Sequence, residues 1–207
     1  MLRSFNSVSL ALVVLCLSLP AVAEDDFSRS SCYVGLAYTL GAEDAVAGLG
    51  DSDSKVGESF AGIHGRVGCR AGWAAGELHF EWLDGFETEV NGQPDRFNGY
   101  SIGFDGKAYI LQFLQMSSAI PEAMRFKLPS VVNRIQPYAT LGFGYLEFSG
   151  PGDLDGWSFA ARFGGGVDVW ITREVSLGVD FSYVKPASAP ISSLDYYSLS
   201  VGVAYMF

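Results

Sequence analysis

The chain of 207 residues has few of the side chains on which metal or nucleic-acid binding depends. It contains two histidines and three cysteines, which are scattered and give no zinc-binding spacing. Lysine and arginine number 13 against 23 acidic residues, so the formal net charge is −10. An acidic chain lacks the basic surface of a nucleic-acid-binding protein. We therefore expect no metal ion, no other cofactor and no nucleic-acid partner.

Long hydrophobic runs are also missing, except at the start of the chain. Residues 1–6 carry one positive charge, an apolar run covers 8–19, and small residues follow at Ala21-Val-Ala23. This pattern predicts a secretory signal peptide over residues 1–23, because the run is too short for a membrane-spanning helix. The remaining residues, 24–207, are expected to form one domain.

Short segments in which large apolar residues alternate with small or polar ones fill most of the remaining chain. At the end of the sequence, Tyr197, Leu199, Val201, Val203 and Tyr205 alternate with mainly small residues. Alternation of this kind places the two sets on opposite faces of a β-strand. It predicts eight strands, over residues 32–40, 60–69, 73–83, 100–110, 136–148, 157–171, 175–184 and 195–207.

The two faces of these strands differ in charge. The large apolar faces carry almost no charge, whereas glycine and charged residues share the other faces. A soluble fold could not be held together by a core of the second kind, but a membrane barrel turns its apolar face to lipid and its polar face inward. We predict an all-β, eight-stranded antiparallel up-and-down transmembrane β-barrel. Its lumen is expected to hold a charge network of Arg66, Glu77, Glu81, Asp105, Lys107, Arg162, Asp168 and Asp180.

The connections between predicted strands alternate in length. Residues 41–59, 84–99, 149–156 and 185–194 form long connections that carry most of the acidic residues, while 70–72 and 172–174 are tight. Barrels of this kind have long extracellular loops and short periplasmic turns. Residues 114–134 break the rule, and their apolar spacing predicts a short interfacial helix or a strand extension.

Cys32 and Cys69 fall on the apolar faces of the first two predicted strands. If they oppose each other, the numbers of paired residues sum to 101, and every residue on the apolar face of one strand then meets a residue on the apolar face of the other. Directly opposed strand residues are close enough for a disulfide. We predict this bridge at the periplasmic rim; the alternative is two free cysteines facing lipid.

Several segments resemble the small eight-stranded outer-membrane barrels of the OmpA and OmpX type, the outer membrane protein beta-barrel domain. They are residues 32–38 (CYVGLAY), 77–82 (ELHFEW), 136–145 (QPYATLGFGY) and the last strand, which ends in Phe207. The resemblance implies the outer membrane of a Gram-negative bacterium. It also implies that Phe207 is the assembly signal read by the outer-membrane assembly machinery.

Three functions remain open at this stage. The first is a structural or interaction barrel, expected to be a monomer in outer-membrane lipid, whose acidic loops meet a ligand that the sequence does not identify. The second is a narrow pore, which side chains in an eight-stranded lumen would plug. The third is a lipid-modifying enzyme, which is disfavoured because no His-x-Ser motif is present and His64 and His79 point into the lumen. We expect these histidines to form hydrogen bonds there.

Overall fold

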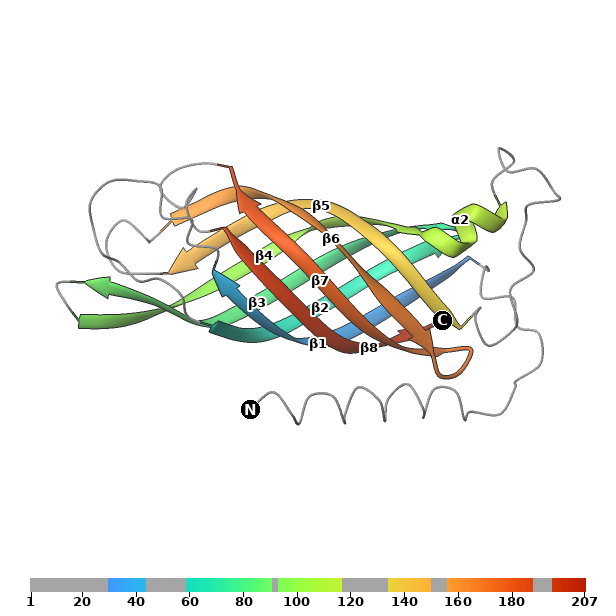
Figure 1. The fold of residues 1–207 in the computed structure, drawn as a ribbon, viewed down its shortest axis with the longest axis horizontal. Helices are drawn as coiled ribbons and strands as arrows, with labels where there is room; N and C mark the ends of the chain where they lie inside the picture. Colours follow the sequence, from blue (N-terminus) through green and yellow to red (C-terminus); the bar gives the residue numbers. More distant parts are fainter. Residues whose placement is uncertain (1–29, 44–58, 91–92, 117–133, 150–155, 188–194) are drawn as a thin grey trace.

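The structure is a computed structural model that describes residues 30–43, 59–90, 93–116, 134–149, 156–187 and 195–207. Within these residues, eight antiparallel strands follow one another around a closed barrel, and a short helix, α2 (Ile110–Met116), lies between the fourth and fifth (Figure 1). The strands are β1 (Ser31–Glu43), β2 (Ser59–Ala71), β3 (Ala74–Val90), β4 (Gln93–Tyr109), β5 (Ile135–Ser149), β6 (Gly156–Trp170), β7 (Val175–Pro186) and β8 (Tyr196–Met206). The predicted fold class is confirmed.

The barrel closes between its first and last strands. Tyr33 of β1 is paired with Met206 of β8, and the ladder continues to the pair of Glu43 and Tyr196. The backbone of Phe207 extends this pairing, because its amide donates to the carbonyl of Cys32 at 2.9 Å. Closure leaves no free sheet edge, so backbone donors and acceptors along the wall are satisfied within the barrel.

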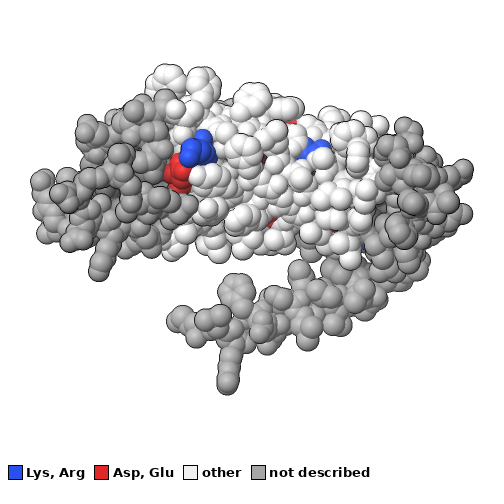
Figure 2. Space-filling model, turned by 45° about the horizontal axis from the view of Figure 1, so that its top comes forward, with Lys and Arg blue, Asp and Glu red and all other residues white. Residues whose placement is uncertain are grey.

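Side chains alternate between the outside and the lumen as the sequence predicts. Large apolar residues such as Leu36, Ile102 and Phe143 are exposed on the outer wall, the last of them by 67%. Arg66 and Glu81 are buried inside. Figure 2 shows that the described wall is mostly uncharged on the face drawn. The barrel is therefore apolar outside and polar within, which is the reverse of a soluble protein.

The two ends of the barrel differ. At one end, which we call the turn end, lie the C-terminus, α2 and the connections β2–β3 and β6–β7 (Figure 1). Gly72 adopts a positive φ of 60° in the first of these turns, a conformation that favours glycine. In the second, the Thr172 hydroxyl accepts hydrogen bonds from the amides of Glu174 and Val175 at 3.2 and 3.0 Å. The opposite end is the loop end.

Residues 84–99 differ from the sequence prediction, which made them a long loop. Most of them belong instead to the extended hairpin of β3 and β4, which reaches Val90 and Gln93 (Figure 1). Gly85, at φ 99°, forms a bulge at which the register shifts between Asp84 and Phe86. A bulge inserts one residue and so changes the parity of the alternation, which is why a strict two-residue pattern ends there.

The connection after β4 is partly described. The fourth strand was predicted to reach Ile110, but that residue begins α2, and residues 114–116 of the predicted interfacial segment lie in this helix. Residues 117–133 and the predicted signal peptide, 1–23, lie outside the described residues. Within the described part of the chain, no helix has the length and apolar character needed to cross a bilayer.

Candidate functional site in the barrel lumen

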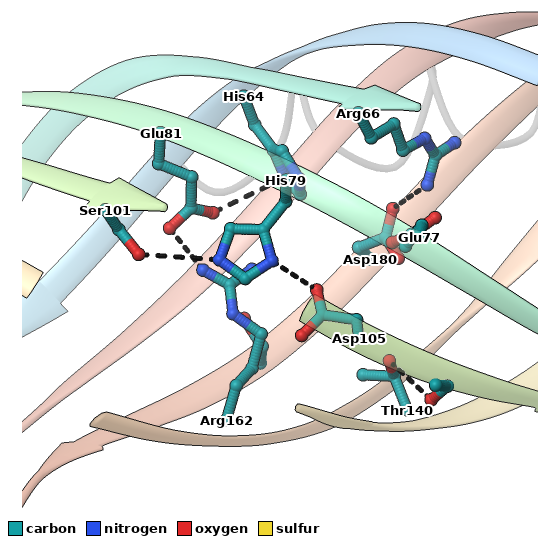
Figure 3. Close-up of polar contacts among 12 residues, drawn as sticks. His64, Arg66, Glu77, His79, Glu81, Ser101, Asp105, Thr140, Arg162 and Asp180 are labelled. Atoms are coloured by element: carbon teal, nitrogen blue, oxygen red, sulfur yellow. Dashed lines mark hydrogen bonds and ion pairs between the residues drawn. The ribbon is translucent and has the colours of Figure 1, made fainter. Parts of the chain in front are cut away.

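Arg162 and Glu81 form a buried ion pair in the lumen. The Arg162 guanidinium on β6 donates to the Glu81 carboxylate on β3, which is fully buried (Figure 3). His64 Nδ1 lies 3.4 Å from the other Glu81 oxygen. Charged groups taken out of water are stable only when they are paired in this way. Three strands are thus connected through one carboxylate.

His79 lies beside this pair and contacts a second carboxylate. Its Nδ1 is 2.8 Å from Asp105 Oδ2, and its Nε2 is 3.4 Å from the Ser101 hydroxyl (Figure 3). The order Ser–His–Asp is that of a hydrolase triad, and sequence reasoning missed it because the residues come from neighbouring strands rather than from one motif. All three side chains are buried, so the contacts orient the histidine but present no exposed nucleophile.

A second group of ion pairs in the lumen is formed by Arg66 and Lys107 with three carboxylates. Arg66 lies 3.2 Å from Asp180 and 3.7 Å from Asp168, measured between nitrogen and oxygen. Lys107 Nζ lies 3.1 Å from Glu77 Oε2 and 3.8 Å from Asp180 Oδ1. Asp180 therefore contacts both cations. Together with the first group, these contacts place all eight residues of the predicted network inside the barrel and arrange them in two sets.

Three tyrosines complete the second group of ion pairs. Tyr33 donates to Glu77 at 2.6 Å, Tyr109 donates to Asp168 at 3.0 Å, and Tyr138 donates to Asp180. The Lys107 ammonium also lies 4.4 Å from the centre of the Tyr138 ring. Each carboxylate thus accepts a hydrogen bond in addition to its ion pair, which such groups require when they are buried. The tyrosines occupy positions that alternate with the apolar, lipid-facing ones, so the sequence could have placed them in the lumen network.

The loop end of the lumen is filled by apolar side chains, which the sequence analysis did not predict. Phe86 stacks on Phe60 and Phe97 with ring centres 4.4 and 5.2 Å apart, and Phe148 and Tyr196 meet these rings edge to face. We call this the loop-end cluster; its members are Phe60, Leu83, Phe86, Phe97, Leu146, Phe148, Ala160, Val184 and Tyr196. Most of these residues continue the alternation of inward-facing positions to the ends of their strands, so the sequence pattern would have indicated them.

The turn end of the lumen is closed around Arg70, which the sequence analysis placed in a turn. Its guanidinium lies 3.7 Å from the centre of the Tyr109 ring and donates to Gln136 at 2.9 Å, to Gln112 of α2 and to the Gly72 carbonyl at 3.0 Å. Trp170 and Met206 are buried near Tyr33 in a separate apolar cluster. The side chain of Arg70 is thus held by the β2–β3 turn, by α2 and by the first residues of β5.

Cys32 and Cys69 form a disulfide, with Cα atoms 3.9 Å apart. The register of β1 and β2 pairs Val34 with Val67 and Tyr38 with Ile63, so the sum of 101 holds along the hairpin. Phe207, the predicted assembly signal, has an exposed side chain beside this bridge at the turn end.

The chemistry of the lumen is that of a packed charge network. Four cationic side chains (Arg66, Arg70, Lys107, Arg162) lie among five carboxylates (Glu77, Glu81, Asp105, Asp168, Asp180). Among the described residues, no group of three or more histidine, cysteine, aspartate or glutamate side chains is arranged to hold a metal ion. The described contacts hold the strands together rather than expose a reactive group.

The family model of the outer membrane protein beta-barrel domain matches residues 9–207, which is nearly the whole chain. No similar sequence was found among curated proteins.

Solved structures share the fold at low sequence identity. Neisserial surface protein A has a TM-score of 0.62 and 16% identity, with 86% of this chain and 99% of that chain covered. A second similar structure is that of Ail, the attachment invasion locus protein of Yersinia pestis, in complex with the heparin analogue sucrose octasulfate. Its TM-score is 0.53 and its sequence identity is 10%, with 86% of this chain and 99% of that chain covered. The outer membrane protein OprG of Pseudomonas aeruginosa has a TM-score of 0.51 and 12% sequence identity, with 88% of this chain and 99% of that chain covered.

Proposed function

Because the chain belongs to the outer membrane protein beta-barrel domain family, we propose that it is a non-conducting structural barrel that presents its acidic loops to an extracellular partner. In this family the long connections face outward and the short turns face the periplasm. The loop end is therefore extracellular and the turn end periplasmic. We further propose that the barrel is a monomer in the outer membrane of a Gram-negative bacterium.

The observation that carries the proposal is that buried side chains occupy the lumen from one end to the other. The loop-end cluster packs aromatic rings across the extracellular side, and the contacts of Arg70 with Gln112 and Gln136 cross the periplasmic side. Two sets of ion pairs occupy the space between. An eight-stranded barrel is only wide enough for side chains to fill, so these contacts support a closed scaffold.

The charge of the extracellular connections limits the class of partner. Residues 44–58 contain four acidic residues and one lysine, and residues 150–155 contain two acidic residues and no basic one. Ail was solved with a polyanionic heparin analogue, but an acidic face repels such a ligand. We propose a cationic partner for this chain. Retention of the folded protein on a heparin column at physiological salt would contradict this choice.

Conductance of the purified, folded protein in a planar bilayer tests the closed lumen. The parent should give no stable current steps. Steps in the parent whose ion selectivity changes in Arg162→Met would place the current in the lumen and overturn the proposal in favour of the narrow pore.

A lipid-modifying enzyme is the remaining alternative, and the contact of Ser101 with His79 is the observation that favours it. We propose a non-enzymatic role because both residues are buried within the barrel, away from the lipid on its outer face. The lipid A mass spectrum of cells with and without the protein should be identical. A mass difference that also disappears in Ser101→Ala would assign the reaction to this hydroxyl.

A further inference from the structure

Helix α2 presents an apolar face outside the barrel and a polar side chain toward the lumen. Ile110, Phe113 and Leu114, at spacings of three and four residues, are 45, 44 and 45% exposed. Residues at these spacings lie on one helix face. Gln112 between them is buried against Arg70. The short helix is therefore amphipathic, although residues 108–116 contain no charged residue at all.

The β2–β3 turn extends the apolar face of the helix. Trp73 packs edge to face on Phe113 with ring centres 5.1 Å apart and is itself 40% exposed. The Trp73 carbonyl accepts a hydrogen bond from the Tyr109 amide at 2.7 Å, directly before the helix begins. Two periplasmic connections are thus fixed to each other, and their side chains form one surface, which we call the periplasmic apolar patch (Trp73, Ile110, Phe113, Leu114).

The periplasmic apolar patch continues the lipid-facing wall of the barrel. β3 and β4 run from the turn into this wall, where Leu78 and Phe104 are exposed as a register pair. Only the small pairs of Ala74 with Ala108 and Gly76 with Gly106 separate that wall from the patch. A contiguous apolar surface next to a bilayer is covered at lowest cost by the bilayer itself.

We infer that α2 and Trp73 form an interfacial anchor that binds phospholipids of the periplasmic leaflet. Tryptophan with uncharged apolar neighbours is the composition that settles at the boundary between headgroups and acyl chains. The anchor has a consequence for the lumen. The side of α2 that faces away from lipid holds Gln112 on Arg70, so binding of the helix to the membrane also holds the periplasmic closure in place.

Spin-label accessibility in phosphatidylcholine vesicles tests the anchor on the full folded chain. With Cys32 and Cys69 joined and Cys16 changed to serine, a nitroxide can be attached to the one introduced cysteine in Phe113→Cys. Leu78→Cys on the wall and Arg173→Cys in the β6–β7 turn serve as references for lipid and water. Compared with the label at position 173, the label at position 113 should be more accessible to oxygen and less accessible to a water-soluble nickel complex. Its two accessibilities should therefore lie nearer to those of the label at position 78.

Two results would overturn the anchor. Nickel access at position 113 equal to that at position 173 would place the helix in water, and low access to both reagents would mean that a protein covers it. If Phe113→Cys does not fold, a variant with Trp82, Trp157 and Trp170 changed to phenylalanine leaves Trp73 as the only reporter. Its fluorescence should be quenched by lipids brominated near the headgroup, and unchanged emission contradicts the proposal. Neither measurement depends on whether the lumen conducts.

Discussion

Replacing Arg162 with methionine should destabilise the barrel more than any exposed charge substitution. The change removes the guanidinium that pairs with Glu81 of β3, whose side chain is fully buried in the lumen. Truncation of one partner of a buried ion pair costs about 3–5 kcal/mol, because the other charge stays buried without compensation. His64 Nδ1, at 3.4 Å from Glu81, can take over part of the role. We therefore expect about 3 kcal/mol, the lower end of that range.

Urea unfolding of the refolded protein in lipid vesicles, followed by tryptophan fluorescence, gives the free energy of unfolding. Lys185→Met is the matched control, because its ion pair with Asp195 is 3.4 Å long and Lys185 is 60% exposed. An exposed pair of this kind contributes only about 0–1 kcal/mol.

A double variant separates the loss of the pair from the loss of packing. Arg162→Met combined with Glu81→Met removes both charges and should recover most of the stability lost in Arg162→Met, since apolar residues can replace a buried pair at little cost. A single variant as stable as the parent would refute the reasoning. So would a double variant that is less stable than the single one, because the loss would then come from packing.

Three further outcomes are expected. The unheated protein should run on a gel as a compact band that shifts on boiling, because a closed ladder resists detergent; identical migration would contradict closure. Removal of Phe207, which is exposed at the turn end, should lower the outer-membrane level of the protein much more than its synthesis, and unchanged levels would exclude it as the assembly signal. Alkylation of the denatured, unreduced protein should label neither Cys32 nor Cys69, which are bridged, whereas two labelled thiols would disprove the bridge.

The wall of the barrel was predictable because lipid imposes a simple rule on it. Every outward position of a membrane-spanning strand must be apolar, so a period of two marks both the strand and its face. The pairing of Cys32 with Cys69 then fixed the register of the first hairpin. Beyond the bilayer this constraint ends, and the continuation of β3 and β4 past Gly85 had no such pattern to mark it.

Partners inside the lumen were harder to predict than its members. Parity indicates that Glu81 and Asp105 point inward, but it does not say which of several inward cations each one meets. Glu81 pairs with Arg162 from β6 on the opposite part of the wall, a choice that depends on side-chain length and on the tilt of the strands. Arg70 was missed because the second strand was predicted to end at Cys69, whereas Arg70 belongs to β2 and continues its inward-facing positions. Gln112 was missed because a helix has no such two-residue alternation.

Three glycines of the strands, Gly35, Gly142 and Gly178, lie opposite charged residues of the lumen. In the strand register, Arg66 is opposite Gly35, Asp105 and Arg162 are both opposite Gly142, and Asp168 is opposite Gly178. A Cβ atom on Gly35 would lie 2.8 Å from Arg66 Nε, and one on Gly142 would lie 1.7 Å from Asp105 Oδ1 and 2.8 Å from the Phe104 carbonyl. In so narrow a lumen, a long charged side chain on one strand needs a position without a side chain on the next. These three glycines therefore supply space in which the ion pairs form, and the two features depend on each other.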